Sequence, residues 1–319
     1  MKFNFKIQSY QTDAVDSIIR VFAGQPKDDK NCEYTRNADI ILSDGQLMRN
    51  INKVQARQNI HLSTKLSCDM GRCALDVEME TGTGKTYVYI KTMFELNKQY
   101  GWSKFIVVVP SIAIREGVKK SMEMTVEHFM EHYGKKARFF IYNGKELSAL
   151  DKFSNDPGIN IMIINTQAFA TSMKEGAKNR ESRIIYSMRD DFNSRRPIDV
   201  IKASRPIVIL DEPQKMGGAA TQTGIRNFNP LFTINYSATH KNHHNEVYVL
   251  DALDAYNHKL VKKIEVVGFE LKNLKGTDSY IYFAELLLSK DKAPQVKLEI
   301  EQQSTTGAIK RIYKKLGEG

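Results

Sequence analysis

The sequence predicts an α/β protein in which helices cover both faces of a parallel sheet, a doubly wound arrangement, and three observations support this prediction. Short apolar runs alternate along the chain with segments of helical periodicity. A glycine-rich stretch over residues 79–86 lies between one such run and the helix that follows it. Polar or acidic residues come directly after several of the runs. Strands that alternate with helices form parallel sheets with right-handed crossovers, and ligands bind at the carboxyl ends of those strands.

The N-terminal part of the chain is expected to hold two helices. The stretch from Gln8 to about Phe22 predicts a helix, because apolar residues recur there on one helical face. From residue 24 to 71 the chain becomes polar and irregular, with few long apolar runs. We interpret this stretch as an insertion with one helix, over residues 44–59, and not as a separate domain.

Residues 79–86 read Met-Glu-Thr-Gly-Thr-Gly-Lys-Thr and predict a phosphate-binding loop between a strand at 76–79 and a helix at 87–96. The glycines let backbone N–H groups approach a polyphosphate, and the helix N-terminus adds partial positive charge. Lys85 would reach the β- and γ-phosphates of ATP, and the Thr86 hydroxyl would ligate Mg²⁺. The predicted nucleotide-binding residues of the loop are Thr81, Gly82, Thr83, Gly84, Lys85 and Thr86.

One position departs from the full loop pattern, which has glycine five residues before Gly84, where this chain has Met79. The difference points away from small kinases and GTPases. It favours ATPases that couple hydrolysis to movement along nucleic acid.

Five further strands and one long helix complete the expected sheet. Residues 104–110 form a continuous apolar run ended by a proline, which is typical of a strand buried on both faces. A helix is expected over residues 114–133. The remaining strands are expected at residues 137–142, 159–164, 206–210 and 232–236.

The acidic pair Asp211 and Glu212 follows the strand at 206–210 and would face the glycine loop across one edge of the sheet. Asp211 would hold Mg²⁺ through water, and Glu212 would polarise the attacking water, so that these two residues and Lys85 form the predicted catalytic set. The alternative is a common Asp-Glu turn before Pro213. Pro110 and Ser111 would lie at the same edge, because they too follow a strand. Residues 165–167 and 237–239 would lie there for the same reason.

The composition favours a polyanionic partner, because the 319-residue chain has a formal net charge of +10 and a pI near 9.3. Residues 171–205 hold nine Lys/Arg against five Asp/Glu, and we interpret them as a solvated helical face rather than a DNA-contacting surface. The three cysteines and the pair His243 and His244 lack metal-ligand spacing, which favours thiols in a reducing cytosol and a polar linker at 241–246. No signal peptide or long apolar run is visible, which predicts a cytoplasmic protein without a membrane partner.

The C-terminal part changes in character and is expected to be rich in strands. Residues 279–288, 295–301 and 308–316 have strand patterns, and the second of these alternates strictly. A few strands without visible partners are only marginally stable. We therefore expect a chain that is cut off within this segment.

The ordered motifs resemble those of superfamily 2 helicase-type motors. More specifically, four stretches are similar to the restriction (Res) subunit of type III restriction–modification enzymes. These stretches are the loop at 79–86, Val-Val-Pro-Ser-Ile-Ala-Ile-Arg-Glu-Gly at 108–117, Asp-Glu-Pro-Gln at 211–214 and Tyr-Ser-Ala-Thr-His at 236–240. The resemblance implies a RecA-like ATP-binding motor domain over residues 1–240. For residues 241–319 it implies a connector, the start of a second motor domain and an incomplete β-rich insertion.

The resemblance also implies roles for single residues. Gln11 would read the adenine edge, with a helix-surface glutamine as the alternative. Gln214, Ser237 and Thr239 would couple hydrolysis to domain movement, and the two hydroxyls could otherwise be ordinary strand ends. Pro110, Ser111 and Thr166 would contact the DNA backbone, in keeping with phosphate contacts that position a protein without reading sequence.

By the same resemblance, the chain would be the ATP-dependent translocase half of a type III restriction subunit. It would act on double-stranded DNA together with a modification (methyltransferase) subunit. Full subunits carry a second motor domain with an arginine finger and a nuclease domain, and we expect neither these nor nuclease activity in this chain. Two alternatives stay open: a DNA helicase outside restriction, and a nucleotide-binding remnant that does not hydrolyse ATP.

Overall fold

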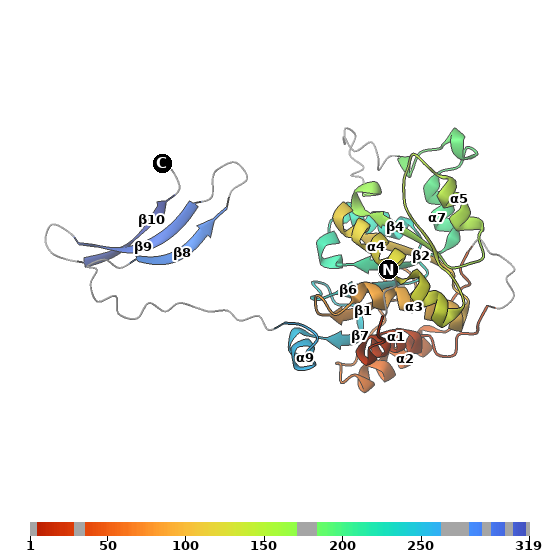
Figure 1. Cartoon of the computed structure of the whole chain (residues 1–319), viewed down its shortest axis with the longest axis horizontal. Helices are drawn as coiled ribbons and strands as arrows, with labels where there is room; N and C mark the ends of the chain where they lie inside the picture. The colour runs from red at the N-terminus through yellow and green to blue at the C-terminus, as the bar shows by residue number, and fades with distance from the viewer. Residues whose placement is uncertain are drawn as a thin grey trace. The chain divides into compact units, whose positions relative to one another are not determined.

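A computed structural model describes residues 5–28, 36–170, 184–262, 281–288, 295–303 and 309–316. The chain divides into two compact units, Met1–Lys263 and Ile264–Gly319. The first unit contains a seven-stranded sheet in the order β3-β4-β2-β5-β6-β1-β7, and the second contains a three-stranded sheet (Figure 1).

All neighbouring strands of the seven-stranded sheet run parallel. Its central strands are buried throughout because both of their faces are covered by helices. The strands are β1 (Ala74–Met79), β2 (Lys104–Val109), β3 (Arg138–Ile141), β4 (Asn160–Asn165), β5 (Ile207–Asp211), β6 (Thr233–Ser237) and β7 (Asn245–Leu250).

Alternate residues of β2 enter two different hydrophobic clusters, one on each face of the sheet. Phe105 and Val107 belong to the first cluster, and Ile106 and Val108 to the second. The first cluster also contains residues of α1 (Ser9–Val21), α2 (Asp44–Arg57), α3 (Lys85–Tyr100) and α4 (Ile112–Tyr133). The second contains residues of α5 (Ser148–Asn155), α7 (Pro197–Ser204) and α8 (Ala219–Asn227). The predicted doubly wound α/β fold is therefore confirmed.

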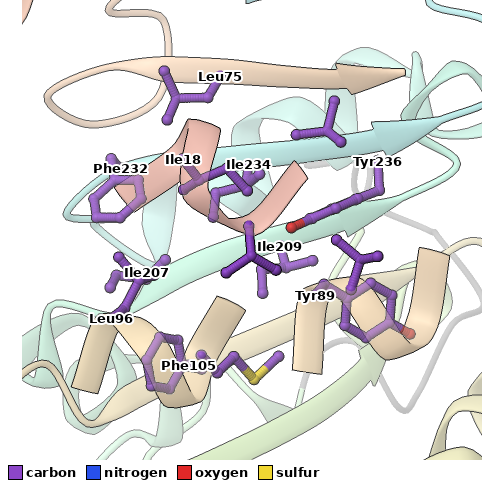
Figure 2. Close-up of a cluster of buried hydrophobic side chains, with 14 of the residues drawn as sticks. Ile18, Leu75, Tyr89, Leu96, Phe105, Ile207, Ile209, Phe232, Ile234 and Tyr236 are labelled. Atoms are coloured by element: carbon purple, nitrogen blue, oxygen red, sulfur yellow. The ribbon is translucent and has the colours of Figure 1, made fainter. Parts of the chain in front are cut away.

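Figure 2 shows the first cluster, in which Ile18 of α1 and Leu96 of α3 pack near the strand residues Leu75, Phe105 and Ile234. These apolar side chains recur on one face of each helix and on alternate positions of each strand. The pattern that predicted the elements is therefore the same pattern that builds this core.

The insertion expected at residues 24–71 contributes to this core as well. Its helix α2 begins at Asp44, as predicted, because Ser43 caps it in a capping box with Gln46. Leu47, Ile51 and Val54 of α2 are buried in the first cluster. The described part of the insertion is thus packed onto the sheet and does not form a separate domain.

The sheet extends past residue 240, where the sequence analysis placed the end of the first domain. Asn245 and Glu246, interpreted as part of a polar connector, begin β7, which pairs in parallel with β1. A short helix, α9 (Ala252–Asn257), follows it within the first unit. The first unit therefore extends beyond residue 240, because β7 is the edge strand beside β1. The mixed polar and apolar sequence of β7 did not predict this pairing.

The basic segment at 171–205 also differs in part from the expected solvated helical face. Residues 171–183 lie outside the described residues. Near the other end of the segment, α7 begins at Pro197, and its residues Ile198 and Ile201 are buried in the second cluster. Proline at the first position of a helix and an apolar stripe opposite the charges explain this helix.

The second unit contains β8 (Ile281–Leu287), β9 (Gln295–Gln303) and β10 (Ile309–Leu316), paired antiparallel in the order β10-β9-β8. The strands that were expected to lack partners therefore pair with one another. Several large apolar side chains of β8 stay exposed, among them Ile281, Phe283 and Leu286. Among the described residues of both units, no helix is both long enough and apolar enough to cross a membrane.

Candidate nucleotide-binding and coupling site

The predicted site residues gather at one edge of the seven-stranded sheet. The strand order places β6 between β5 and β1, so that Ser237 at the end of β6 lies between Asp211 and the glycine loop. Pro110 and Ser111 follow β2, and Thr166 follows β4, on the other side of β5. Because all these strands are parallel, their carboxyl ends share one edge.

The glycine loop is held by the first turn of α1. Gly82 and Gly84 have φ values of +86° and +90°, which residues with a Cβ rarely adopt. A Cβ on Gly84 would lie 2.6 Å from Nε2 of Gln11, so the Gln11 side chain would have to move to make room for it. Nε2 of Gln11 and the Tyr10 hydroxyl donate hydrogen bonds to the Thr83 carbonyl oxygen, at 3.1 and 2.9 Å. Gln11 thus contacts the loop, and its neighbour Tyr10 is a contact that the sequence analysis missed.

Lys85 is the first residue of α3, and its ammonium group points back across the loop. Its Nζ donates a hydrogen bond to the carbonyl oxygen of Met79 at 3.1 Å and lies 3.3 Å from Oε1 of Glu212. The Met79 side chain itself is fully buried in the core. Lys85 contacts the backbone carbonyl of Met79, which a residue of any type can supply, and Met79 is not among the described residues with positive φ.

Asp211 ends β5 with its side chain buried, and only 6% of the residue is exposed. Burial, with the nearby charge of Glu212, raises the pKa of Asp211 to about 6, although Lys85 and Lys215 oppose the shift. A divalent cation beside this carboxylate would offset the cost of its buried charge. The carboxylate of Asp211 and the hydroxyl of Thr86 are the hard oxygen ligands that Mg²⁺ prefers, so the donor set fits that ion.

Glu212 adopts a left-handed backbone conformation, with φ +62° and ψ +57°, directly before Pro213. Its backbone N–H donates a hydrogen bond to the Tyr236 carbonyl of β6 at 2.9 Å. Such a conformation costs a non-glycine residue about 1–3 kcal/mol and is concentrated at functional sites. It directs the carboxylate toward Lys85 and away from the strand.

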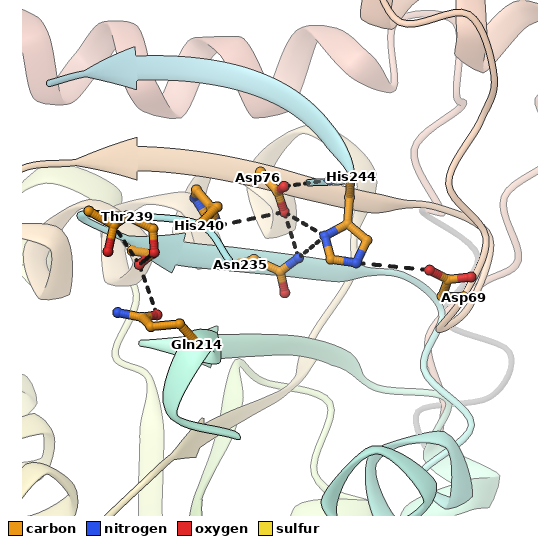
Figure 3. A network of polar contacts seen from close by, with 8 residues as sticks. Asp69, Asp76, Gln214, Asn235, Thr239, His240 and His244 are labelled. Carbon is orange, nitrogen blue, oxygen red and sulfur yellow. Dashed lines mark hydrogen bonds and ion pairs between the residues drawn. The ribbon is translucent and has the colours of Figure 1, made fainter. Parts of the chain in front are cut away.

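The three predicted coupling residues form one chain of contacts that starts at Glu212. Gln214 donates a hydrogen bond from Nε2 to Oε2 of Glu212, and its Oε1 accepts one from the Ser237 hydroxyl at 2.9 Å. The same hydroxyl lies 2.6 Å from the Thr239 carbonyl oxygen and accepts a hydrogen bond from the Thr239 N–H at 3.0 Å (Figure 3). One hydroxyl proton can serve only one of its two acceptors, so Ser237 can switch between Gln214 and Thr239.

The residues predicted to contact DNA lie at the ends of β2 and β4. The Ser111 hydroxyl caps α4 by accepting a hydrogen bond from the Ile114 N–H, and the Thr166 hydroxyl lies 3.4 Å from the Pro110 carbonyl oxygen. Arg115 of α4 donates a hydrogen bond from Nη1 to Oδ1 of Asn165 at 3.0 Å. The sequence analysis missed this arginine as a basic group beside the expected DNA contacts.

A cavity of about 590 Å³ opens at the glycine loop and has a volume typical of small-molecule sites. Gly82, Gly84, Lys85 and Thr86 line it together with Asp211, Glu212 and Lys215, and apolar side chains such as Ile90 and Ile114 complete its wall. A second cavity, of about 690 Å³, lies beside α5 and α7 and contains none of the predicted site residues. The lining residues of the cavity at the glycine loop, and not its volume, therefore identify it as the candidate site.

A buried polar network on β1 and β6 was not predicted. Asp76 of β1 is fully buried and accepts hydrogen bonds from the His244 backbone N–H at 2.6 Å and from Asn235 at 2.7 Å, and Nδ1 of His244 lies 3.0 Å from its Oδ1 (Figure 3). Nδ1 of His240 lies 4.0 Å from the same carboxylate. The segment interpreted as a polar linker thus covers Asp76. No local signal could have found this pairing, because Asp76 and His244 are 168 residues apart.

Comparison with known proteins agrees with the motifs. Residues 4–242 match the family described as type III restriction enzyme, res subunit. The chain is 32% identical over 273 residues to the EcoPI Res subunit of Escherichia phage P1, and 32% identical over 272 residues to the EcoP15I Res subunit of Escherichia coli. Each alignment covers 80% of this chain, which spans 28% of the length of either relative.

Two more distant similarities were found. The StyLTI Res subunit of Salmonella typhimurium is 28% identical over 242 residues, which are 65% of this chain and 24% of the relative. A solved structure of a nuclease-deletion mutant of the type ISP restriction–modification enzyme LlaGI, in complex with a DNA substrate mimic, aligns with a TM-score of 0.44 and 12% identity, over 80% of this chain and 21% of the other. The family match and the closer relatives are sufficient: the chain belongs to the family of type III restriction enzyme Res subunits.

Proposed function

We propose that this chain binds ATP with Mg²⁺ and hydrolyses it to drive movement along double-stranded DNA, as a RecA-like motor domain of a type III restriction system. The observation that carries the proposal is the contact between Lys85 and Glu212, at 3.3 Å, which joins the glycine loop to the coupling residues. The family supports use of a nucleotide by this domain. The lining of the loop cavity supports ATP with Mg²⁺ as that nucleotide.

Binding would use the backbone N–H groups of residues 81–86, which surround the phosphates at the N-terminus of α3. Lys85 would leave the Met79 carbonyl and contact the β- and γ-phosphates, since a polyphosphate is a stronger partner for an ammonium group than a carbonyl. Thr86 and Asp211 would hold Mg²⁺, whose charge offsets that of the phosphates. Gln11, which already contacts the loop, would read the adenine edge.

Hydrolysis would use Glu212 as the group that polarises the attacking water. Its carboxylate contacts both Lys85 and Gln214, so loss of the γ-phosphate would change the charge that Glu212 faces. That change can pass through Gln214 to the hydroxyl of Ser237 and the backbone of Thr239. We assign these three residues to coupling for that reason.

DNA would be contacted at the phosphate backbone by Pro110, Ser111 and Thr166, at the ends of β2 and β4. The formal net charge of +10 favours such a partner. Site recognition would belong to a methyltransferase subunit of the same system. Nuclease action is assigned to no residue of this chain.

The proposal is tested by titrating a fluorescent ATP analogue with Mg²⁺ against wild type, Lys85→Ala and Lys98→Ala. Removing the charge-assisted contact of Lys85 should weaken binding by about 10- to 150-fold, which corresponds to about 1.5–3 kcal/mol. Lys98→Ala removes the same charge near the far end of α3, where the side chain is 61% exposed, and should bind as the wild type does. Equal affinity of Lys85→Ala and wild type would refute the assignment.

One observation favours a second candidate function, nucleotide binding without efficient hydrolysis. Among the described residues that line the loop cavity there is no arginine. In related phosphoryl-transfer systems an arginine finger contributes about 10³–10⁵ in rate. DNA-stimulated ATP turnover by the 319-residue chain would decide between the two functions, with robust turnover favouring the motor and its absence favouring the silent binder.

A further inference from the structure

Lys215 is a second basic residue in the lining of the cavity at the glycine loop, in addition to Lys85. The ammonium group of Lys85 already has two partners, the carbonyl oxygen of Met79 and the carboxylate of Glu212. Lys215 is exposed, and its side chain forms no hydrogen bond or ion pair with any residue that the structure describes. The charge of Lys215 is therefore available to a ligand that enters this cavity.

The turn that carries Lys215 is fixed on both sides of this residue. The Lys215 N–H donates a hydrogen bond to the Glu212 carbonyl oxygen at 3.0 Å, which closes a short 3₁₀ turn after the left-handed residue. The side chain of Gln214 accepts a hydrogen bond from the Ser237 hydroxyl (Figure 3), and Met216 is buried in the second hydrophobic cluster. The backbone of Lys215 is thus held in place, while its side chain lines the open cavity.

The place of this turn indicates which part of a nucleotide Lys215 would reach. In the proposed complex, Lys85 contacts the β- and γ-phosphates, and Glu212 polarises the water that attacks the γ-phosphate. This water lies on the side of the γ-phosphate that faces away from the β-phosphate, because the attacking and leaving oxygens are in line. Lys215 is on the turn that Glu212 begins, and both residues line the cavity, so the ammonium group would approach the γ-phosphate.

We propose that Lys215 binds the γ-phosphate and so enables the site to distinguish ATP from ADP. This inference rests on the proposed function, and it adds a specificity-determining residue to the loop lysine and the acidic pair. Hydrogen bonds from an ammonium group to phosphate oxygens are among the strong ones in proteins, and ADP offers no such oxygens at the γ position. Gln214 precedes Lys215 on the same turn and contacts Ser237, so loss of the γ-phosphate would remove a contact where the coupling residues begin.

The test compares two variants: Lys215→Met keeps an unbranched side chain without the charge, and Lys215→Arg keeps the charge. A fluorescent, non-hydrolysable ATP analogue is titrated with MgCl₂ against the 319-residue chain, and ADP is measured by displacement of that analogue. Lys215→Met should weaken binding of the ATP analogue about tenfold and leave ADP binding unchanged. Lys215→Arg should keep the preference of the wild type for the ATP analogue.

Lys145→Met is the matched control, because Lys145 is also exposed and has no side-chain partner among the described residues, but does not line the cavity. The control should bind both nucleotides as the wild type does, and a loss of preference in it as well would overturn the proposal. An equal loss of affinity for the ATP analogue and ADP in Lys215→Met would also overturn it, since a general effect on the cavity would then explain the loss.

The remaining outcomes separate this inference from the proposed function. An unchanged preference in Lys215→Met, or a lost preference in Lys215→Arg, would overturn the role of the Lys215 charge. Either result would leave the proposed function intact if Lys85→Ala still weakens binding. Absence of nucleotide binding by the wild type would refute the proposed function and this inference together.

Discussion

Glu212 combines an unusual backbone conformation with two side-chain contacts at the candidate site. Its backbone is in the left-handed region, and one carboxylate contacts both the loop lysine and the glutamine that leads to Ser237. Lys85 and Glu212 form an ion pair in the lining of the cavity, so in the proposed complex Glu212 would compete with phosphate for that lysine. The residue would thus oppose nucleotide binding slightly while serving the proposed hydrolysis.

Glu212→Gln should therefore separate binding from turnover. Loss of the group that polarises water should lower ATP turnover by about 10²- to 10⁴-fold. Affinity for ATP should stay the same or increase, because the amide no longer pairs with the Lys85 charge. Single-turnover hydrolysis and analogue binding measure the two effects, with Glu146→Gln as a control at an exposed position outside the cavity lining. A parallel loss of binding and turnover would contradict the assigned role.

At the scale of elements, the segment between β6 and β7 acts as part of the sheet. The second hydrophobic cluster covers β5 but includes no residue of β1 or β6. On that face Asp76 of β1 and Asn235 of β6 lie instead in a polar network beneath residues 240–244. The contacts from Gln214 through Ser237 end at Thr239, which directly precedes this segment. The Asp76 network therefore holds the residues that follow Thr239.

The Asp76–His244 pair predicts a pH window for stability. The hydrogen bond to Asp76 is the main reason that the pKa of His244 is raised above its ordinary 6.5, against the effect of burial. Burial would raise the pKa of Asp76, but hydrogen bonds and the His240 and His244 charges lower it below 3.8 overall. The contribution of His244 to the free energy of unfolding is thus present below pH 6.5 and is lost as pH rises through the raised pKa of His244. That of Asp76 is present above pH 3.8 and is lost as pH falls through its lowered pKa.

Unfolding of wild type and His244→Asn should consequently differ most between pH 3.8 and 6.5, by about 1.5–3 kcal/mol for a hydrogen bond to a buried charge. The difference should shrink outside this window on both sides. Denaturant unfolding across the pH range measures it, and Asp76→Asn should show the same window. A difference that does not vary with pH would mean that the pair is not ionised in the folded protein.

At the scale of the whole molecule, the two units differ in how much apolar surface they bury. The first unit contains both hydrophobic clusters, whereas every residue from Ile281 to Leu286 in the three-stranded sheet is exposed. Local opening costs little where few apolar contacts are buried. Limited proteolysis should accordingly leave a fragment that ends after α9, since β7 is hydrogen-bonded into the sheet.

ATP with Mg²⁺ should protect that fragment and leave the cleavage of the second unit unchanged. Mass spectrometry of the digest identifies the C-terminal end. A second unit that resists protease as well as the first would show that it is a stable domain by itself, contrary to this expectation.

DNA binding by the whole chain should be weak, independent of sequence and sensitive to salt. The assigned contacts are hydroxyls and backbone at the ends of β2 and β4, with Arg115 beside them, and they suit phosphates rather than bases. Each neutralised phosphate contributes a slope of about −0.9 to log K against log salt, so a few contacts give a shallow slope. Fluorescence anisotropy at several salt concentrations measures it. A sequence-specific footprint that persists at high salt would exclude this mode of binding.

The sequence by itself determined the local features of this protein. It placed the glycine loop between a strand and a helix, located β1 to β6 and α1 to α4 within a few residues, and collected the strand-end motifs at one edge. These features depend on the order of apolar and polar residues over short distances, because the period of a helix or strand and the chemistry of glycine act locally. The C-terminal strands were found for the same reason.

Only the tertiary structure decided which distant residues meet. It placed β6 between β5 and β1, added β7 beside β1, and paired Asp76 with His244 across 168 residues. A strand pattern predicts burial but not the neighbouring strand, because pairing depends on how the whole sheet closes its hydrophobic faces and satisfies its buried polar groups.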